Sequence, residues 1–149
     1  MASGPSLAAL IRSTAASGVV FISGDVHYGE MSAFVPEESD EAPTYPLYDV
    51  TSSGITQSKR WHFHPPNSRR IPGTPLVRNR NNFGVLELDA GADDSQGAAG
   101  AGARLHFSVR GEKGEVLANL TVPLRSLQAP LVGGGGAETT AAAANVAVR

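Results

Sequence analysis

Asp25 and His27 stand two positions apart in a glycine-flanked segment, from Gly24 to Gly29, that follows a short apolar run. An Asp-x-His pair offers one oxygen and one nitrogen donor, a combination that suits zinc, iron or manganese. The two glycines allow tight backbone turns, so both side chains can point toward one place. Two donors do not complete a metal site, and the same spacing also fits a plain turn in which His27 is hydrogen-bonded at a strand end. For a metal site, the remaining ligands must come from elsewhere.

Charged residues are segregated along the chain, although the formal net charge is only −2. The segment from Asp25 to Asp49 holds seven acidic residues and no Lys or Arg, whereas the segment from Lys59 to Arg80 holds six basic residues and no acid. One interpretation is a carboxylate cluster for cations beside a basic rim for an anion, and the other is two solvated loops that attract each other weakly. Arg78 and Arg80 could bind a phosphate bidentately or could be solvated.

The absence of cysteine and the small net charge exclude several classes of site, and the other histidines offer few further metal ligands. The chain has no cysteine, which excludes thiolate-ligated zinc, iron–sulfur clusters and cysteine nucleophiles. The small net charge gives no bulk attraction to nucleic acid, and no apolar run is long enough to span a bilayer. His62 and His64 form a His-x-His pair, for which exposed loop histidines are the favoured interpretation over metal or phosphate contacts. His106 is interpreted as a solvent-facing or hydrogen-bonded strand residue.

The elements that position these residues begin with a helix predicted from about Ser6 to Ala15 and ended by Gly18. The run Val19–Ile22 is β-branched or aromatic and bounded by glycines, which predicts a strand buried on both faces. A helix followed by a buried strand favours an α/β fold class. Asp25 and His27 would then stand just beyond the carboxyl end of this strand, where α/β sheets place their active sites.

Four more strands are predicted further along the chain, and the last two are joined by a hairpin loop at 111–114. They are Tyr48–Ser52, Gly84–Leu88, Arg104–Arg110 and Val116–Val122. If the first of these is parallel to Val19–Ile22, both strands end at one edge, and the basic segment 59–80 begins there as a substrate rim. Residues 1–128 are predicted to form one domain with a flexible insertion at 90–103. Residues 129–149 are predicted to be a disordered Gly/Ala-rich tail.

Several segments together resemble a known family. Ser23-Gly24-Asp25-Val26-His27-Tyr28-Gly29-Glu30 after an apolar strand looks like the last metal-binding motif of PhoD-like alkaline phosphatases, a branch of the calcineurin-like metallophosphoesterases. Three later features fit the same family in the same order. They are Tyr48–Gly54, the Arg78–Gly84 segment that leads into a strand, and a closing pair of strands around a hairpin. The resemblance covers roughly residues 6–127.

The resemblance implies a fold of mixed sheets flanked by helices, of which this chain looks like the β-rich carboxyl-terminal third. It implies that Asp25 and His27 are metal ligands, and that Arg78, Arg80 and Asn82 contact the substrate. The reaction would be hydrolysis of a phosphate mono- or diester by a metal-bound hydroxide at a two-metal centre. Iron, calcium, zinc and manganese are the candidate metals.

The family's earlier motifs are an Asp-x-His, a Gly-Asp-x-x-Asp and an Asn-His followed by an acid. They should precede the last motif by well over a hundred residues, but only 24 residues precede Asp25. We therefore expect the chain to need a missing amino-terminal part of the same domain and to be inactive alone. The competing hypothesis is a non-catalytic β-rich module that binds an anionic ligand or a partner through the basic segment 59–80. An apolar surface left open along Val19–Ile22 would favour the enzyme part over the self-contained module.

Overall fold

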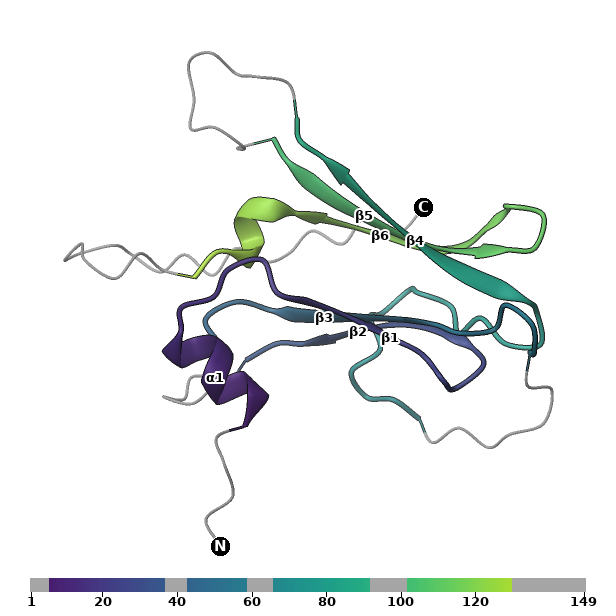
Figure 1. Cartoon of the computed structure of the whole chain (residues 1–149), viewed down its shortest axis with the longest axis horizontal. Helices are drawn as coiled ribbons and strands as arrows, with labels where there is room; N and C mark the ends of the chain where they lie inside the picture. Colours follow the sequence, from purple (N-terminus) through teal and green to yellow (C-terminus); the bar gives the residue numbers. More distant parts are fainter. Residues whose placement is uncertain (1–5, 37–42, 59–65, 92–101, 130–149) are drawn as a thin grey trace, which may run out of the picture.

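The computed structural model describes residues 6–36, 43–58, 66–91 and 102–129 (Figure 1). The described chain is β-rich, with two small, mostly antiparallel sheets and one α-helix. The elements in chain order are α1 (Leu7–Ser13), β1 (Val20–Ser23), β2 (Gly29–Phe34), β3 (Leu47–Ser52), β4 (Asn82–Asp89), β5 (Arg104–Gly111), β6 (Val116–Pro123) and a 3₁₀ helix (Leu124–Leu127). We call β1-β3-β2 sheet A and β4-β5-β6 sheet B, with the strands named in their spatial order.

Helix α1 confirms the predicted helix within two residues at each end. The Ser6 hydroxyl accepts a hydrogen bond from the backbone N–H of Ala9 at 3.2 Å, so it satisfies one of the free amides of the first turn. Ile11 is the buried residue of the helix, while Leu7 and Leu10 are about half exposed. The helix therefore contributes one apolar side chain to the core.

Sheet A confirms one expectation about its strands and corrects another. Strand β1 is parallel to β3, with Val20 opposite Tyr48, so both strands end at the same edge as predicted. The expectation that the first strand is buried on both faces is wrong, because β1 is the edge strand of sheet A and Ile22 is 72% exposed. Strand β2 was not predicted; it runs antiparallel to β3 on its other side.

Sheet B confirms the three later strands. Strand β5 pairs antiparallel with both β4 and β6, and the turn between β5 and β6 is closed by a hydrogen bond from Gly114 N–H to Gly111 O at 2.9 Å. Gly114 has a φ of +83°, a conformation that glycine adopts without steric cost. Along β5, and along β6 from Ala118 to Val122, the apolar residues alternate with polar ones, and Phe107 and Leu120 are almost fully buried. The period-2 pattern thus identifies the face that packs on sheet A.

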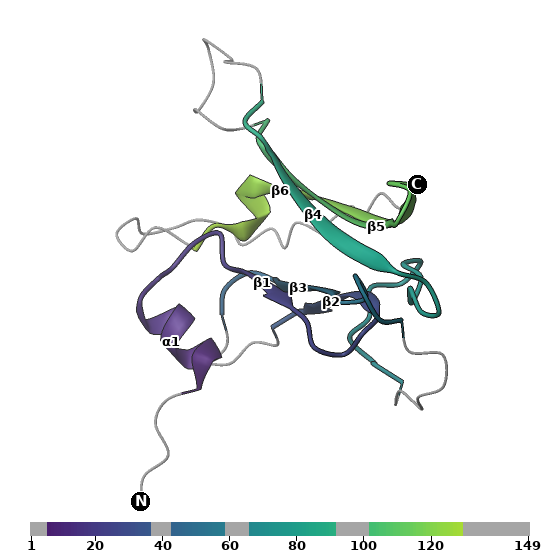
Figure 2. The ribbon, with the colours of Figure 1, turned by 45° about the vertical axis from the view of Figure 1, so that its right-hand side comes forward.

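The two sheets face one another, as Figure 2 shows. Two glycines permit the close approach at the end where β3 finishes. A Cβ added at Gly29 of β2 would lie 2.8 Å from Val109 Cγ1 of β5, and one added at Gly84 of β4 would lie 3.2 Å from Ser52 Cβ of β3. At this end β2 therefore lies against β5, and β3 lies against β4.

Two expectations lie outside the described residues. Most of the predicted flexible insertion at 90–103 falls in the range 92–101. The predicted disordered tail falls almost wholly in the range 130–149.

Candidate functional site

Four strand ends meet at one edge of the sandwich, which we call the site edge. Strands β1 and β3 finish there at Ser23 and Ser52, and β2 and β4 begin there at Gly29 and Asn82. The turn 24–28 joins β1 to β2 at this edge. The predicted location of Asp25 and His27, just beyond the end of the first strand, is therefore confirmed.

Asp25 and His27 both have left-handed backbone conformations, with φ of +68° and +62°. Asp25 is exposed and His27 is half-buried. The backbone N–H of His27 donates to Ser53 Oγ at 2.9 Å, and the backbone N–H of Ser53 donates to the Tyr28 carbonyl oxygen at 3.3 Å. These two bonds fasten the turn to the end of β3. Convergence of the Asp25 and His27 side chains on a metal ion stays a prediction.

Left-handed conformations cost free energy in residues with a Cβ, and such strain is often kept at functional sites. We expect Asp25→Gly to raise the free energy of unfolding by about 0.5–1 kcal/mol, because relief of strain exceeds the entropy that glycine loses. The matched control is Val26→Gly, in the same turn without a positive φ, which should be destabilising. Urea denaturation of both variants checks this. A loss of stability in Asp25→Gly as large as that in Val26→Gly would show that the turn is not strained.

The carboxylate of Asp25 and the imidazole of His27 are groups that bind metal ions, but two such groups are too few for a metal site. Within the described ranges, no group of three or more His, Asp or Glu side chains is arranged to hold a metal. Two donors are fewer than a protein metal site normally needs. His62 and His64 lie outside the described residues. The described residues therefore do not form a complete metal centre by themselves.

The carboxyl-terminal end of the basic segment reaches the site edge. Val77 and Gly29 exchange two backbone hydrogen bonds of 2.8 Å, and this pair places Arg78 and Arg80 just beyond the start of β2. Both arginines are exposed. The expectation that the basic segment lies over the site edge is thus confirmed for this end of it.

The remaining described arginines of that segment lie elsewhere. The chain from Arg69 to Val77 runs along β2, so Arg69 and Arg70 lie near the opposite end of that strand. The Arg69 guanidinium stands 5.1 Å from the centre of the Phe34 ring, and Arg70 Nε lies 4.0 Å from Glu30 Oε1. These two cations are engaged along β2 and do not belong to a rim at the site edge.

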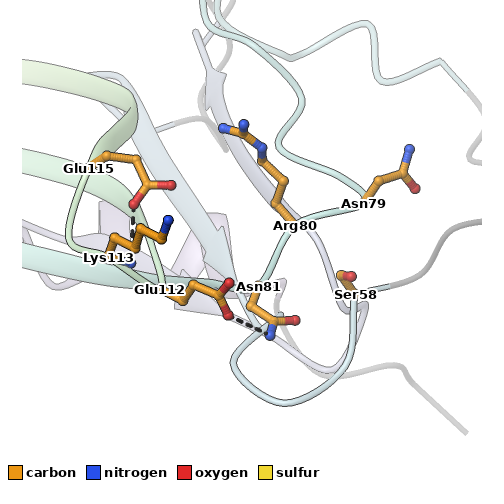
Figure 3. A pocket seen from close by; sticks show the side chains of 7 residues that line it. All are labelled: Ser58, Asn79, Arg80, Asn81, Glu112, Lys113 and Glu115. Carbon is orange, nitrogen blue, oxygen red and sulfur yellow. Dashed lines mark hydrogen bonds between the residues drawn. The ribbon is translucent and has the colours of Figure 1, made fainter.

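Arg80 also lines a hollow of about 350 Å³ between the start of β4 and the β5–β6 turn (Figure 3). The other lining residues are Ser58, Asn79, Asn81, Glu112, Lys113 and Glu115. Two acidic side chains balance the two basic ones, and Asn81 Nδ2 donates to Glu112 Oε2 at 3.2 Å. The hollow therefore has no charge preference for an anion.

Asn82 is the most enclosed of the predicted site residues, with 1% of its surface exposed. Its Oδ1 accepts from Ser52 Oγ at 3.0 Å and from the Gly54 N–H at 3.4 Å. Its Nδ2 donates to the Arg80 carbonyl oxygen at 3.0 Å. The structure gives Asn82 a place inside the protein, and a contact with substrate stays a prediction.

A polar cluster on the outer face of sheet A was not predicted. Ser23 Oγ donates to Asp49 Oδ1 at 2.8 Å and lies 2.7 Å from Thr51 Oγ1. Burial raises the pKa of Tyr28, and the charges of Glu30 and Asp49 raise it further. The alternation of polar and apolar residues along β3 is the sequence signal that could have revealed this face.

His106, on sheet B, has its Nδ1 3.0 Å from Thr121 Oγ1, as expected of a hydrogen-bonded strand histidine.

Comparison with known proteins gives no match to this chain among protein-family models, curated proteins or solved structures. Among the described residues, no helix is long and apolar enough to cross a membrane.

Proposed function

We propose that the chain is the carboxyl-terminal part of a PhoD-like metallophosphatase domain of the α/β metallophosphoesterase class. In this proposal the complete domain hydrolyses phosphate mono- or diesters, and Asp25 and His27 contribute two of its metal ligands. The remaining ligands come from an amino-terminal part of the same domain. The metal ions, when bound, supply activation of water and neutralisation of phosphate charge. The observation that carries the proposal is an apolar flank left open on one side of both sheets, at Ile22 near the end of β1 and at Leu86 and Leu88 in the second half of β4.

The inner faces of the two sheets become more exposed toward one edge strand in each. On sheet A, Met31 of β2 and Val50 of β3 are 0% and 5% exposed, whereas Ile22 of β1, on the same face, is 72% exposed. On sheet B, the inner-face apolar residues of β5 and β6 are buried, whereas Leu86 and Leu88 of β4 are 43% and 64% exposed. Burial therefore falls off at β1 and at β4.

Strands β1 and β4 lie on the same side of the sandwich. Because β2 lies against β5 and β3 lies against β4, β1 stands next beyond β3 on the side where sheet B ends at β4. We call this side, with Ile22, Leu86 and Leu88, the open flank. The opposite edge of sheet A is covered, since Gly29 and Ser32 of β2 pair with residues of the 66–77 segment.

A parallel edge strand with this composition supports the proposal. Parallel strands occur mostly in larger sheets with both faces covered, and they are rich in β-branched and aromatic residues, as Val20, Phe21 and Ile22 are. Val20 and Phe21 pack partly against the core, and a self-contained module would be expected to bury Ile22 as well. An additional strand beside β1 would cover Ile22, three residues before Asp25, and further chain over the second half of β4 would cover Leu86 and Leu88.

The open flank can be tested on the chain by itself. We expect Ile22→Lys to change the free energy of unfolding by less than about 0.5 kcal/mol, because the side chain is already exposed. The same change should reduce binding of a hydrophobic dye and self-association in sedimentation. Val50→Lys, one strand inward on the same face, is the matched control and should unfold the chain, because it buries a charge without a partner.

If Ile22→Lys were as destabilising as Val50→Lys, the flank would be covered in the isolated chain. The alternative function would then be favoured, namely a non-catalytic module that binds an anionic ligand or a partner chain. The observation behind that alternative is that Arg78 and Arg80 are exposed and form no ion pair with any described residue.

A further inference from the structure

We infer that Asn82 is a positioning residue that fixes the Asp25–His27 turn and Arg80 relative to one another, through the segment Ser52–Gly54. This inference rests on the proposed function for its catalytic meaning, although the coupling itself is a property of the chain. It assigns Asn82 a role that differs from contact with a substrate.

The first half of the coupling joins the turn to the end of β3. Ser53 accepts from the His27 N–H through its hydroxyl and donates its own N–H to the Tyr28 carbonyl. A Cβ added at Gly24 would lie 3.3 Å from Ser53 Cβ, so the turn also packs closely on this residue. The position of Ser53 therefore determines the position of the His27 backbone.

The second half joins the end of β3 to Arg80. Asn82 holds both neighbours of Ser53, because its Oδ1 accepts from the Ser52 hydroxyl and from the Gly54 N–H. Its backbone N–H donates to the Gly54 carbonyl at 3.1 Å, and its Nδ2 donates to the Arg80 carbonyl. One side chain thus joins the segment under His27 to the backbone of the arginine at the same edge.

The chemistry of this position requires an asparagine. The contacts use an acceptor toward Ser52 and Gly54 and a donor toward Arg80, and an amide carries both on one short side chain. An aspartate keeps the acceptor and loses the donor, and an alanine loses both. Because the site is enclosed, polar groups that lose Asn82 are not freely satisfied by water.

Nuclear magnetic resonance on the 149-residue chain tests the inference without any metal, substrate or activity. In Asn82→Ala we expect the His27 amide hydrogen to exchange about tenfold faster, the factor that corresponds to the loss of one ordinary hydrogen bond. The His27 and Arg80 amide resonances should also shift. In Asn82→Asp the acceptor toward Ser52 and Gly54 is kept, whereas the donor toward Arg80 is lost and a carboxylate is enclosed. The Arg80 resonance should therefore move most, and the His27 amide should keep more of its protection than in Asn82→Ala, which is the partial rescue that a positioning role predicts.

Val122→Ala is the control for a general loss of stability, because Val122 is buried in sheet B and pairs with Leu105 at the far end of β5. If Val122→Ala accelerates His27 exchange as much as Asn82→Ala does, the positioning role is overturned. Should Asn82→Ala fail to fold, Ser52→Ala removes one donor to Oδ1 and keeps Asn82. An unchanged His27 amide in Ser52→Ala would then overturn the inference. A confirmed coupling in a chain whose complete domain hydrolyses no phosphate ester would overturn the proposed function alone.

Discussion

If the proposed amino-terminal part of the domain is joined to the chain, His27→Ala is expected to lower turnover of p-nitrophenyl phosphate by about 100- to 1000-fold. This is the size of effect that follows the loss of one group supporting charge stabilisation in the transition state. The reason is the location of His27 in a turn of left-handed backbone conformation at the site edge, where the proposed function makes it a metal ligand. Steady-state assays in the presence of added manganese, zinc, calcium or ferric ions measure the effect.

His106→Ala is the matched control for that assay, because it removes the same side chain from sheet B, where Nδ1 meets Thr121. Its turnover should equal that of the unchanged protein. The 149-residue chain by itself should show no turnover above buffer, since about three or more protein ligands per ion are normally needed. Robust turnover of the isolated chain, abolished by His27→Ala, would contradict the view that ligands come from elsewhere.

Gly54→Ala is expected to lower the free energy of unfolding by about 2–4 kcal/mol, through overpacking together with the loss of buried hydrogen bonds. A Cβ added at Gly54 would collide with Asn82 Nδ2 and would lie 3.0 Å from its Cγ. Asn82 has no room to withdraw, because it is enclosed and bonded to Ser52 and Arg80. Thermal and urea denaturation of the 149-residue chain measure the change.

Gly102→Ala is the control for the glycine substitution itself. Of the atoms in the described residues, a Cβ there would have only Gly91 Cα within 4 Å, at 3.8 Å. This variant should therefore be close to neutral in stability. Equal losses in the two variants would mean that close packing against Asn82 does not explain the cost at Gly54.

The strands that could be predicted from sequence are those whose burial follows a local pattern. Along 104–110 and 118–122 apolar and polar residues alternate, and the structure has strands β5 and β6 there. Strand β2 lacks that signal, because it begins with a glycine and Glu30, and Glu30 is buried. The ion-pair partner of Glu30 is Arg70, forty residues further along the chain, and no local sequence pattern reveals that pairing.

The exposure of β1 could not be predicted for a related reason. The apolar composition of Val19–Ile22 favours burial, although Ile22 is exposed in the structure. Whether Ile22 is buried depends on which strands lie beside it, and among the described residues β1 has β3 as its strand partner. Local sequence therefore predicts that β1 is suited to burial, but it does not contain the identity of the strands that would bury it.

At the candidate site, sequence predicted the location but not the contacts. The glycines around Asp25 and His27 indicated a turn at a strand end, and the turn is there. The sequence did not show that the turn is held by Ser53, or that Asn82 is enclosed, since these partners are 26 to 30 residues apart. Contacts of this kind depend on how β3 and β4 are stacked, which only the tertiary structure specifies.

Sequencing the transcript upstream of the codon for Met1 tests the central claim most directly. The claim is that this chain completes a metallophosphatase domain whose other metal ligands precede it. We expect the upstream sequence to be in frame and to encode, in order, an Asp-x-His, a Gly-Asp-x-x-Asp and an Asn-His followed by an acidic residue. An upstream sequence that is closed by a stop codon, or that is open but lacks these motifs, would contradict the account.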